Sequence, residues 1–375
     1  MSPKAAFIYS DDLTRHLLRD DHPLKSVRLR NTYDLLCSYG AFSSRESTLV
    51  EPRMATEKEL LTFQTLDYLE AVKSFSRDEQ LYVPSKYNLG KAGDNPIYSG
   101  MYEAAVLSTG ASLVAAELVA DKVVETAFSI SGGLHHAASG NASGFCVFND
   151  PVIAINHFLS RGLKVAYVDV DAHHGDGVQN AFIDTRDVLT ISIHESGTFL
   201  FPGTGFVEEM GNGNGEGYSV NVPLYPYTGD EVYLWVFREI VPPLVNAFKP
   251  DVLVTQLGVD SYHSDPLTHL GLTSIGFIGV VSEFAQFKLP WLALGGGGYD
   301  ISAVSRCWTL AYGVMTEQQY PDEIPRTQRG RHGRIKLRDS EQSVGFDGFD
   351  LDVRRQAEDS VDLVKRLIFP AHDLT

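Results

Sequence analysis

Acidic, histidine and tyrosine side chains gather where five apolar, strand-like segments of the chain end. The segment at 126–131 runs into SGGLHH, 164–170 into DAHHGD, 251–258 into VDSYHSD and 291–295 into GGGY, while 188–194 ends on His194. Ligands of open α/β sheets bind beyond the carboxyl ends of the strands, so we expect these dispersed side chains to converge at one site.

The spacing of three of these residues suits a metal. Asp169, Asp171 and His173 alternate as DxDxH, which places all three on the same side of an extended segment. A catalytic zinc takes three nitrogen or oxygen ligands and keeps one position open for water. Asp171 and His173, joined by Asp260 from a later strand end, would supply that set. The alternative is that these acids cap the following helix, whose N-terminus attracts negative charge.

His135 and His136 are adjacent, so both rings face one cavity only on an irregular backbone, which the preceding Gly-Gly pair permits. Two histidines near a metal-bound water predict proton transfer. Asp169 and Asp176 offer each ring a carboxylate that fixes its tautomer and tunes its basicity. The alternative is that the histidines are core residues with satisfied hydrogen bonds.

Tyr299 follows four consecutive glycines, a run that lets the backbone direct a side chain into a site. A phenol beside a metal-bound carbonyl would donate a hydrogen bond to the oxyanion formed on water attack, a contact typically worth about 3–4 kcal/mol. The alternative is an ordinary buried aromatic ring.

The elements that position these residues alternate between strands and helices. The predicted strands cover 5–10, 126–131, 164–170, 188–194, 251–258 and 291–295, and the predicted helices cover 103–122, 151–161, 229–248, 274–287 and 301–314. Alternating strands and helices indicate βαβ units and a mostly parallel sheet with helices on both faces. The predicted fold is a single α/β domain over 1–375, with a helical C-terminal extension from about 315.

Composition excludes several classes of protein. The 375 residues hold 31 Lys+Arg against 48 Asp+Glu, a net charge of −17, which opposes nucleic acid as a ligand. The three cysteines form no CxxC pair, so a disulfide framework and a Cys-rich zinc site are both excluded and a reducing compartment fits best. With no signal peptide and no run of about 18 apolar residues, we expect a cytoplasmic protein without a membrane partner.

At this point a family resemblance is visible over residues 22–310. The chain resembles the zinc-dependent histone deacetylase superfamily, and within it the class I enzymes and the bacterial acetoin utilization proteins. The matching segments are HPLKSVRLRNTYDLL (22–36), GDNP (93–96), SGGLHHAASGNASGFCVFND (131–150), YVDVDAHHGDGVQNAF (167–182), FPGTG (201–205), YSVNVPL (218–224), QLGVDS (256–261) and GGGGYDISAVSRCWTL (295–310).

The resemblance implies roles for individual residues. It implies zinc on Asp171, His173 and Asp260, an acid/base pair of His135 and His136 with Asp169 and Asp176 as their respective partners, and Tyr299 polarising an acetyl carbonyl. It implies an acetyl-lysine tunnel at Gly144, Phe145, Phe201 and Leu267, a rim aspartate at Asp94, and Arg28 in an internal acetate channel. It also implies two sites for K⁺ or Na⁺, one at Asp169, Asp171, His173, Ser192 and Ile193, the other at Phe182, Thr185, Val188 and Tyr218.

The implied activity is hydrolysis of N-ε-acetyl-lysine amides in proteins, with acetyl-coenzyme A synthetase as a candidate substrate. Three alternatives stay open: an acetylpolyamine amidohydrolase, a ureohydrolase with two manganese ions, and a non-catalytic acetyl-lysine sensor. The Asp/His/Asp set would also accept Fe²⁺ or Co²⁺ in place of Zn²⁺. The acyl-chain preference and the oligomeric state are not determined by the sequence.

Overall fold

The computed structural model describes residues 3–15, 18–340 and 350–375. Within these residues a single sheet holds eight strands in the order β2-β1-β3-β8-β7-β4-β5-β6, and every neighbouring pair is parallel. The strands are β1 (Ala5–Ile8), β2 (Ser47–Val50), β3 (Thr126–Ser129), β4 (Val165–Asp169), β5 (Val188–Glu195), β6 (Ser219–Leu224), β7 (Val252–Gln256) and β8 (Trp291–Leu294). The predicted α/β fold is confirmed.

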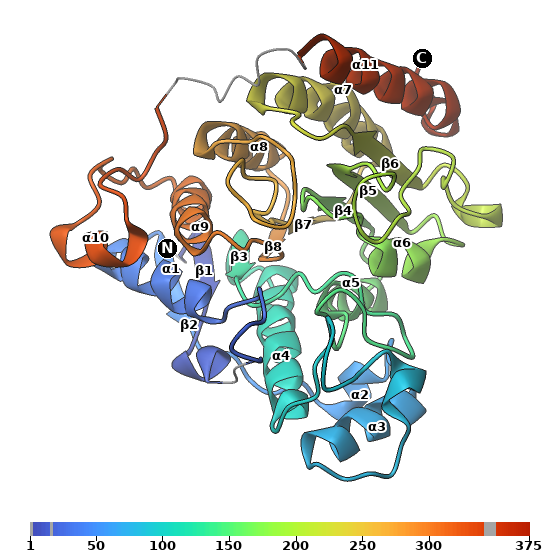
Figure 1. Cartoon of the computed structure of the whole chain (residues 1–375). Coiled ribbons are helices and arrows are strands. Elements are labelled where there is room, and N and C mark those ends of the chain that lie inside the picture. Colours follow the sequence, from blue (N-terminus) through green and yellow to red (C-terminus); the bar gives the residue numbers. More distant parts are fainter. Residues whose placement is uncertain (1–2, 16–17, 341–349) are drawn as a thin grey trace.

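Helices cover both faces of the sheet (Figure 1). One face packs against α4 (Met101–Ala120), α5 (Asp150–Ser160) and α6 (Asp176–Phe182). The other packs against α1 (Val27–Ser38), α7 (Asp230–Phe248), α8 (Ser274–Gln286) and α9 (Ile301–Met315). The remaining helices are α2 (Glu57–Leu60), α3 (Leu66–Ser76), α10 (Arg326–His332) and α11 (Asp350–Leu367).

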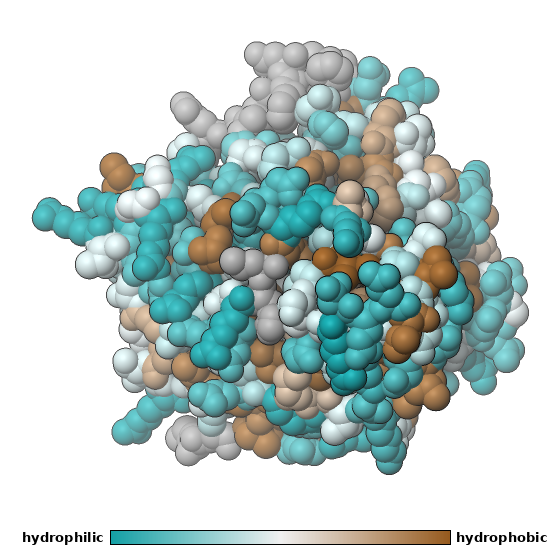
Figure 2. All heavy atoms as spheres, turned by 60° about the horizontal axis from the view of Figure 1, so that its bottom comes forward, coloured by the Kyte–Doolittle hydropathy of each residue, from teal (hydrophilic) through white to brown (hydrophobic). Residues whose placement is uncertain are grey.

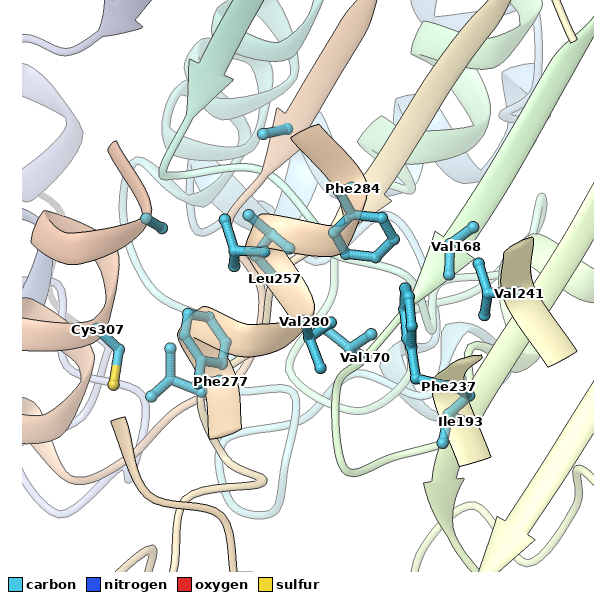
Figure 3. Close-up of a cluster of buried hydrophobic side chains, with 14 of the residues drawn as sticks. Val168, Val170, Ile193, Phe237, Val241, Leu257, Phe277, Val280, Phe284 and Cys307 are labelled. Atoms are coloured by element: carbon cyan, nitrogen blue, oxygen red, sulfur yellow. The ribbon is translucent and has the colours of Figure 1, made fainter. Parts of the chain in front are cut away.

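The central strands are apolar on both sides because both sides are buried. In β4, Val165 and Tyr167 belong to the core under α4 and α5, whereas Ala166 and Val168 belong to the core under α7 and α8. Figure 3 shows the second core, where Phe237 of α7 and Phe284 of α8 lie near Val168. This burial on both faces explains the continuous apolar runs that predicted the strands.

All six predicted strands are confirmed. The two strands at the edges of the sheet were missed. β2 and β6, at the two ends of the sheet, were not predicted. β6 has the sequence SVNVPL, which contains two polar residues and a proline. An edge strand tolerates both because one of its sides needs no ladder hydrogen bonds, and this weakens the sequence pattern.

Helix α11 covers the β6 edge from the predicted C-terminal extension. The Gln356 amide donates to Pro223 O at 2.9 Å and accepts from Tyr225 N at 2.9 Å, and Ser360 Oγ also donates to Pro223 O at 2.9 Å. These bonds occupy backbone groups that would otherwise form an open sheet edge. Residues 341–349 of the predicted extension lie outside the described residues.

Among the described helices, α4 alone is long and apolar enough to span a membrane by length and composition. Within the structure 56% of its most apolar window is buried, and it packs on α5 and β3. The same length and composition are found in core helices of soluble proteins, so the finding is weak evidence for a membrane span. Over the face shown in Figure 2, hydrophilic residues predominate and hydrophobic residues form small groups between them.

Candidate active site

The strand order brings the predicted site residues together. β3, β8, β7 and β4 are consecutive in the sheet. The residues that follow them are, in the same order, the histidine pair, Tyr299, Asp260, and the segment with Asp171 and His173. The carboxyl ends of these four parallel strands therefore form a single site near the middle of the sheet. The fifth predicted strand end does not join it: the buried His194 ring instead contacts Ser192 Oγ at 2.8 Å and Gly205 O at 2.9 Å.

Asp171, His173 and Asp260 form a compact buried group whose ligand atoms all lie within 4.8 Å of one another. His173 Nδ1 is 3.0 Å from Asp171 Oδ1 and 3.1 Å from Asp260 Oδ2. Two carboxylates and one imidazole suit a zinc, iron or cobalt ion, and two buried carboxylates this close are costly without a cation between them. The residues present therefore fit a divalent metal.

Gly297 is required beside this group. A Cβ atom at this position would lie 1.9 Å from Asp260 Oδ2 and 2.8 Å from Asp171 Oδ2, so any side chain would displace both carboxylates. The glycine run before Tyr299 thus lets the backbone approach the metal ligands, and Gly297 N also donates to Asp171 Oδ2 at 2.8 Å.

The histidine pair is tied to two separate carboxylates. His135 Nδ1 donates to Asp169 Oδ2 at 2.8 Å, and His136 Nδ1 donates to Asp176 Oδ1 at 2.7 Å. The two Nε2 atoms are 3.0 Å apart. Because each Nδ1 is bonded to a carboxylate, Nε2 is the nitrogen of each ring that is available for proton transfer.

A narrow pocket of about 20 Å³ leads to these groups and is also lined by Leu134, Phe145 and Tyr299. The Phe201 ring closes another side, with its centroid 5.1 Å from that of His136. Gly144 is needed here, because a Cβ would lie 2.3 Å from His136 Cδ2. The pocket is thus narrow and has aromatic walls.

Phe145 is held in a strained backbone conformation at φ +70°. Its N–H donates to Asn95 Oδ1 at 2.9 Å, and its ring meets the ring of His22 edge-on at 4.6 Å. The His22 ring in turn donates to Asp94 O at 3.2 Å. Left-handed backbone at a bulky residue costs about 1 kcal/mol or more and persists where neighbours fix it, as they do at this wall of the pocket.

Comparison with known proteins agrees with this geometry. The model of the histone deacetylase domain matches residues 22–315. The chain belongs to the histone deacetylase family. It is 40% identical over 336 residues to the acetoin utilization protein AcuC of Bacillus subtilis (strain 168), a match that covers 86% of this chain and 84% of AcuC. It is 37% identical over 325 residues to human histone deacetylase 1, covering 86% of this chain and 66% of the human protein.

Solved structures resemble the deacetylase over nearly its whole length. A histone deacetylase homologue from Aquifex aeolicus superposes with a TM-score of 0.87 at 30% identity, covering 96% of this chain and all of the other. A histone deacetylase homologue complexed with SAHA gives the same TM-score at 29% identity, covering 97% of this chain. The family assignment and the enzyme class, a deacetylase acting as a hydrolase, are therefore confirmed.

Electrostatics separate the two histidines of the deacetylase. Burial lowers the pKa of His135, but the charges of Asp169 and Asp171 outweigh burial and raise it to about 9. Burial and the neighbouring His135 lower the pKa of His136 to about 4, although Asp176 opposes them. The two shifts run in opposite directions, so His135 binds a proton more strongly than His136 does.

The group formed by Asp171, His173 and Asp260 strongly attracts positive charge. Burial lowers the pKa of His173, but the carboxylates of Asp171 and Asp260 outweigh burial and raise it to about 10. Burial and the charge of Asp171 raise the pKa of Asp260 to about 7. A divalent cation would relieve both effects, because it would neutralise the two carboxylates and replace a proton on His173.

The residues predicted for the tunnel and the acetate channel have different environments. Leu267 is 36% exposed, on the loop in which Asp265 accepts from the N–H groups of Leu267 and Tyr299. Arg28 is buried, donates to Gly298 O at 3.2 Å, and lines a cavity of about 260 Å³. This cavity shares Leu24, Leu134 and Phe145 with the narrow pocket, as an internal channel would. Asp94 is exposed and lies apart from the buried groups.

The residues suggested for monovalent cations fall into two places. Ser192 and Ile193 lie on β5, and Ser192 is paired in register with Asp169 of β4, next to the metal group. The other set lies away from it: Thr185 N donates to Phe182 O at 3.2 Å, and Tyr218 O accepts from Thr190 N at 2.9 Å, while Val188 begins β5. Neither arrangement tests cation binding, so both cation sites stay predictions.

Two residues to which we assigned no role from the sequence hold the turn that carries the histidine pair. The Asp150 carboxylate, fully buried, accepts from Gly133 N at 3.0 Å and Leu134 N at 2.9 Å. The Asn149 amide donates to His135 O at 3.0 Å and to Ala137 O at 2.9 Å. Both residues follow the matching GFCVF segment, but only the folded turn shows what they bind.

Gln256 is a third such residue, at the end of β7. Its Nε2 donates to Asp171 Oδ2 at 2.6 Å and its Oε1 accepts from Gly258 N at 2.7 Å. The amide is fully buried and so has no water to replace these partners. Gln256 therefore fixes the orientation of a metal-ligand carboxylate.

We expect Gln256→Leu to weaken zinc binding by about 10- to 100-fold, as losses of such supporting hydrogen bonds typically do. Competition with a chromophoric chelator would measure the affinity directly. Gln318→Leu is the matched control, because it removes an amide that donates to Ala41 O away from the site. Unchanged zinc affinity in Gln256→Leu would contradict the orienting role.

Proposed function

We propose that this deacetylase hydrolyses the ε-acetyl amide of lysine in proteins, with one Zn²⁺ held by Asp171, His173 and Asp260. The observation that carries the proposal is the buried Asp-His-Asp group at the base of a narrow pocket that His136 and Tyr299 also line. A divalent cation held by these three residues would polarise a carbonyl and would lower the pKa of a water molecule toward about 7.

The chain's own groups divide the proton transfers between them. His136, neutral at pH 7, takes a proton from the attacking water at Nε2 and later gives it to the leaving amine. His135, held charged by Asp169, stabilises negative charge nearby. Burial and the charge of Asp260 raise the pKa of Tyr299 well above its usual range, so its hydroxyl stays protonated and donates to the developing oxyanion.

The shape of the pocket favours an acylated lysine. Phe145 and Phe201 would provide aromatic walls for an uncharged alkyl stem, and the exposed Asp94 would hold the substrate backbone at the rim. A net charge of −17 favours basic protein segments around the modified lysine. The cavity beside Arg28 provides a route for acetate.

Two alternatives have less support from the geometry. A second metal ion, as in a manganese ureohydrolase, needs free acids, but Asp169 is bonded to His135 and Tyr167, and Asp265 is bonded to backbone N–H groups. A sensor without activity would not need an assembled histidine pair, metal group and tyrosine. An acetylpolyamine, as a small-molecule substrate, would be hydrolysed by the same chemistry.

The likeness to AcuC extends the proposal to metabolism. We propose a cytoplasmic location and an acetylated metabolic enzyme, with acetyl-coenzyme A synthetase as the first candidate. We also propose that K⁺ or Na⁺ binds at the two predicted cation sites, the one that includes Ser192 and Ile193 and the one that includes Phe182 and Tyr218. Mass spectrometry of acetylated proteins in cells with and without the enzyme would identify the substrate.

Acetate release by the zinc-loaded protein tests the central proposal. We expect turnover of an acetyl-lysine peptide to exceed turnover of an acetylated polyamine at equal concentration. Turnover of the polyamine alone would assign a small-molecule amidohydrolase. No turnover of either, with one zinc bound per chain, would contradict the proposed reaction.

A further inference from the structure

Among the described residues, the exposed aromatic side chains are concentrated in one part of the sequence. Of the described residues, the five most exposed aromatic side chains all lie between residues 199 and 227 and are 37–52% exposed: Phe199, Phe201, Phe206, Tyr225 and Tyr227. We call four of them, Phe199, Phe201, Tyr225 and Tyr227, the aromatic shelf; Phe206 is not included, because its N–H donates to Glu209 Oε1 and its ring makes no contact with the other four. Aromatic rings left in water on a soluble protein are uncommon, and a group of them marks a binding surface.

The shelf is continuous with the wall of the active-site pocket. Phe201 belongs to both, because its ring also contacts those of His136 and His173. Phe199 lies two residues before it and meets the Tyr225 ring edge-on at 5.5 Å. The loops that carry them leave the sheet side by side, since Ser196 N donates to Leu224 O at 2.7 Å.

Backbone hydrogen bonds connect the shelf to the loop that carries Leu267 and His269. Tyr227 N donates to His269 O at 2.6 Å, and the rings of the two residues lie 6.3 Å apart. His269 N donates to the buried carboxylate of Glu195 at 2.7 Å. Leu267, on the same loop as His269, is the predicted tunnel residue on that side. The shelf therefore borders the pocket along one side of its mouth.

The chemistry of the shelf is uncharged. Residues 196–206 and 224–228 contain no Asp, Glu, Lys or Arg, although 21% of the chain is charged. Aromatic enrichment with few charges is typical of the centre of a protein–protein contact. A polyamine would instead need exposed carboxylates for its ammonium groups.

We propose that the aromatic shelf binds a bulky apolar side chain next to the acetyl-lysine of a protein substrate. This inference rests on the proposed deacetylase function and names the substrate class of the same site. Asp94 lies on the Phe145 side of the pocket, through Asn95 and His22, and the shelf lies on the Phe201 side. An extended substrate segment would thus have its backbone held at Asp94 and a neighbouring side chain packed on the shelf.

Peptide pairs test the inference. The zinc-loaded enzyme is compared on acetyl-lysine peptides that differ only in Phe or Gly directly before, or directly after, the modified lysine, and on a blocked single acetyl-lysine. We expect kcat/KM to be about five- to tenfold higher for Phe on at least one side, as expected for partial burial of an aromatic ring. Equal values for Phe and Gly would overturn the inference while leaving the proposed function intact. Inactivity on every compound, including the single acetyl-lysine, would remove the proposed function and the inference together.

Variants of the shelf give the second test. Phe199→Ala and Tyr225→Ala should each abolish most of the Phe/Gly preference, whereas Tyr225→Phe should keep it. Val123→Ala is the control, because it removes an exposed apolar side chain just before β3, at the amino ends of the strands and so away from the carboxyl ends that carry the site. If both alanine variants fold and keep the preference, the inference is wrong. A shelf that instead pairs two copies of the chain would show a dimer that Tyr225→Ala dissociates, with an unchanged peptide preference, and would also overturn it.

Discussion

Removal of the bound metal is expected to lower acetate release by about 1,000-fold or more, and one equivalent of Zn²⁺ per chain is expected to restore it. The ion supplies several kcal/mol of transition-state stabilisation, and each 1.36 kcal/mol is about tenfold in rate. The described residues provide three ligands in one buried group, so a single ion should suffice. Dialysis against a chelator, followed by titration with zinc and elemental analysis, measures both the loss and the stoichiometry.

Asp260→Asn separates metal binding from folding. The asparagine Oδ1 can still accept from Ala172 N, which donates to Asp260 Oδ1 at 2.8 Å. The substitution removes repulsion with Asp171 but also the contact of Asp260 Oδ2 with His173 Nδ1 at 3.1 Å, so the metal-free variant should be about as stable as the metal-free native chain. Zinc affinity, by contrast, should fall by about 100-fold, and the zinc-dependent rise in melting temperature should shrink with it.

The control for this experiment is Asp359→Asn, on the exposed face of α11, which removes a carboxylate away from the site. It should bind zinc and release acetate like the native chain. Two ions bound per chain at full activity would contradict the mononuclear site and favour the ureohydrolase alternative. Full activity in the chelated protein would contradict the metal-dependent reaction itself.

Tyr299→Phe is expected to lower kcat by about 100- to 1,000-fold with little change in KM. Loss of a single oxyanion donor typically has this effect, because the hydrogen bond strengthens as negative charge develops. The phenylalanine ring would keep the edge-on contact with Phe145, whose centroid lies 5.8 Å away, and the backbone N–H would still donate to Asp265. Steady-state kinetics on an acetyl-lysine peptide would measure the change.

Two further measurements show whether the lost hydroxyl acts on the reaction. The melting temperature of Tyr299→Phe should stay close to that of the native chain. Among the described residues, Tyr299 is held by its backbone N–H, which donates to Asp265, and its hydroxyl has no partner. Tyr82→Phe removes a hydroxyl outside the pocket and should leave kcat unchanged. Native turnover in Tyr299→Phe would show that the oxyanion role is wrong.

The sequence by itself determined the fold class and most of the site. Continuous apolar runs predicted six strands because those strands are buried on both faces, and the side chains at their ends predicted a metal and proton-transfer site. Local pattern was enough for Asp171 and His173, which lie two positions apart on one extended segment. The family resemblance paired each histidine with its carboxylate, and the structure places them 2.8 Å and 2.7 Å apart.

Only the tertiary structure decided the contacts that depend on strand order. Local sequence records burial and side-chain chemistry, but it does not record that β7 lies beside β4, which brings Gln256 to Asp171 across 85 positions. Likewise, Asn149 and Asp150 hydrogen-bond the backbone of the turn with the histidine pair only once that turn has folded beside them. The aromatic shelf combines the loop after β5 with the loop after β6. Because β6 is an edge strand that the sequence pattern did not predict, this pairing of loops was not predicted either. Residues far apart in the chain meet because their strands are neighbours in the sheet, and the order of the strands depends on how the whole sheet and its helices pack.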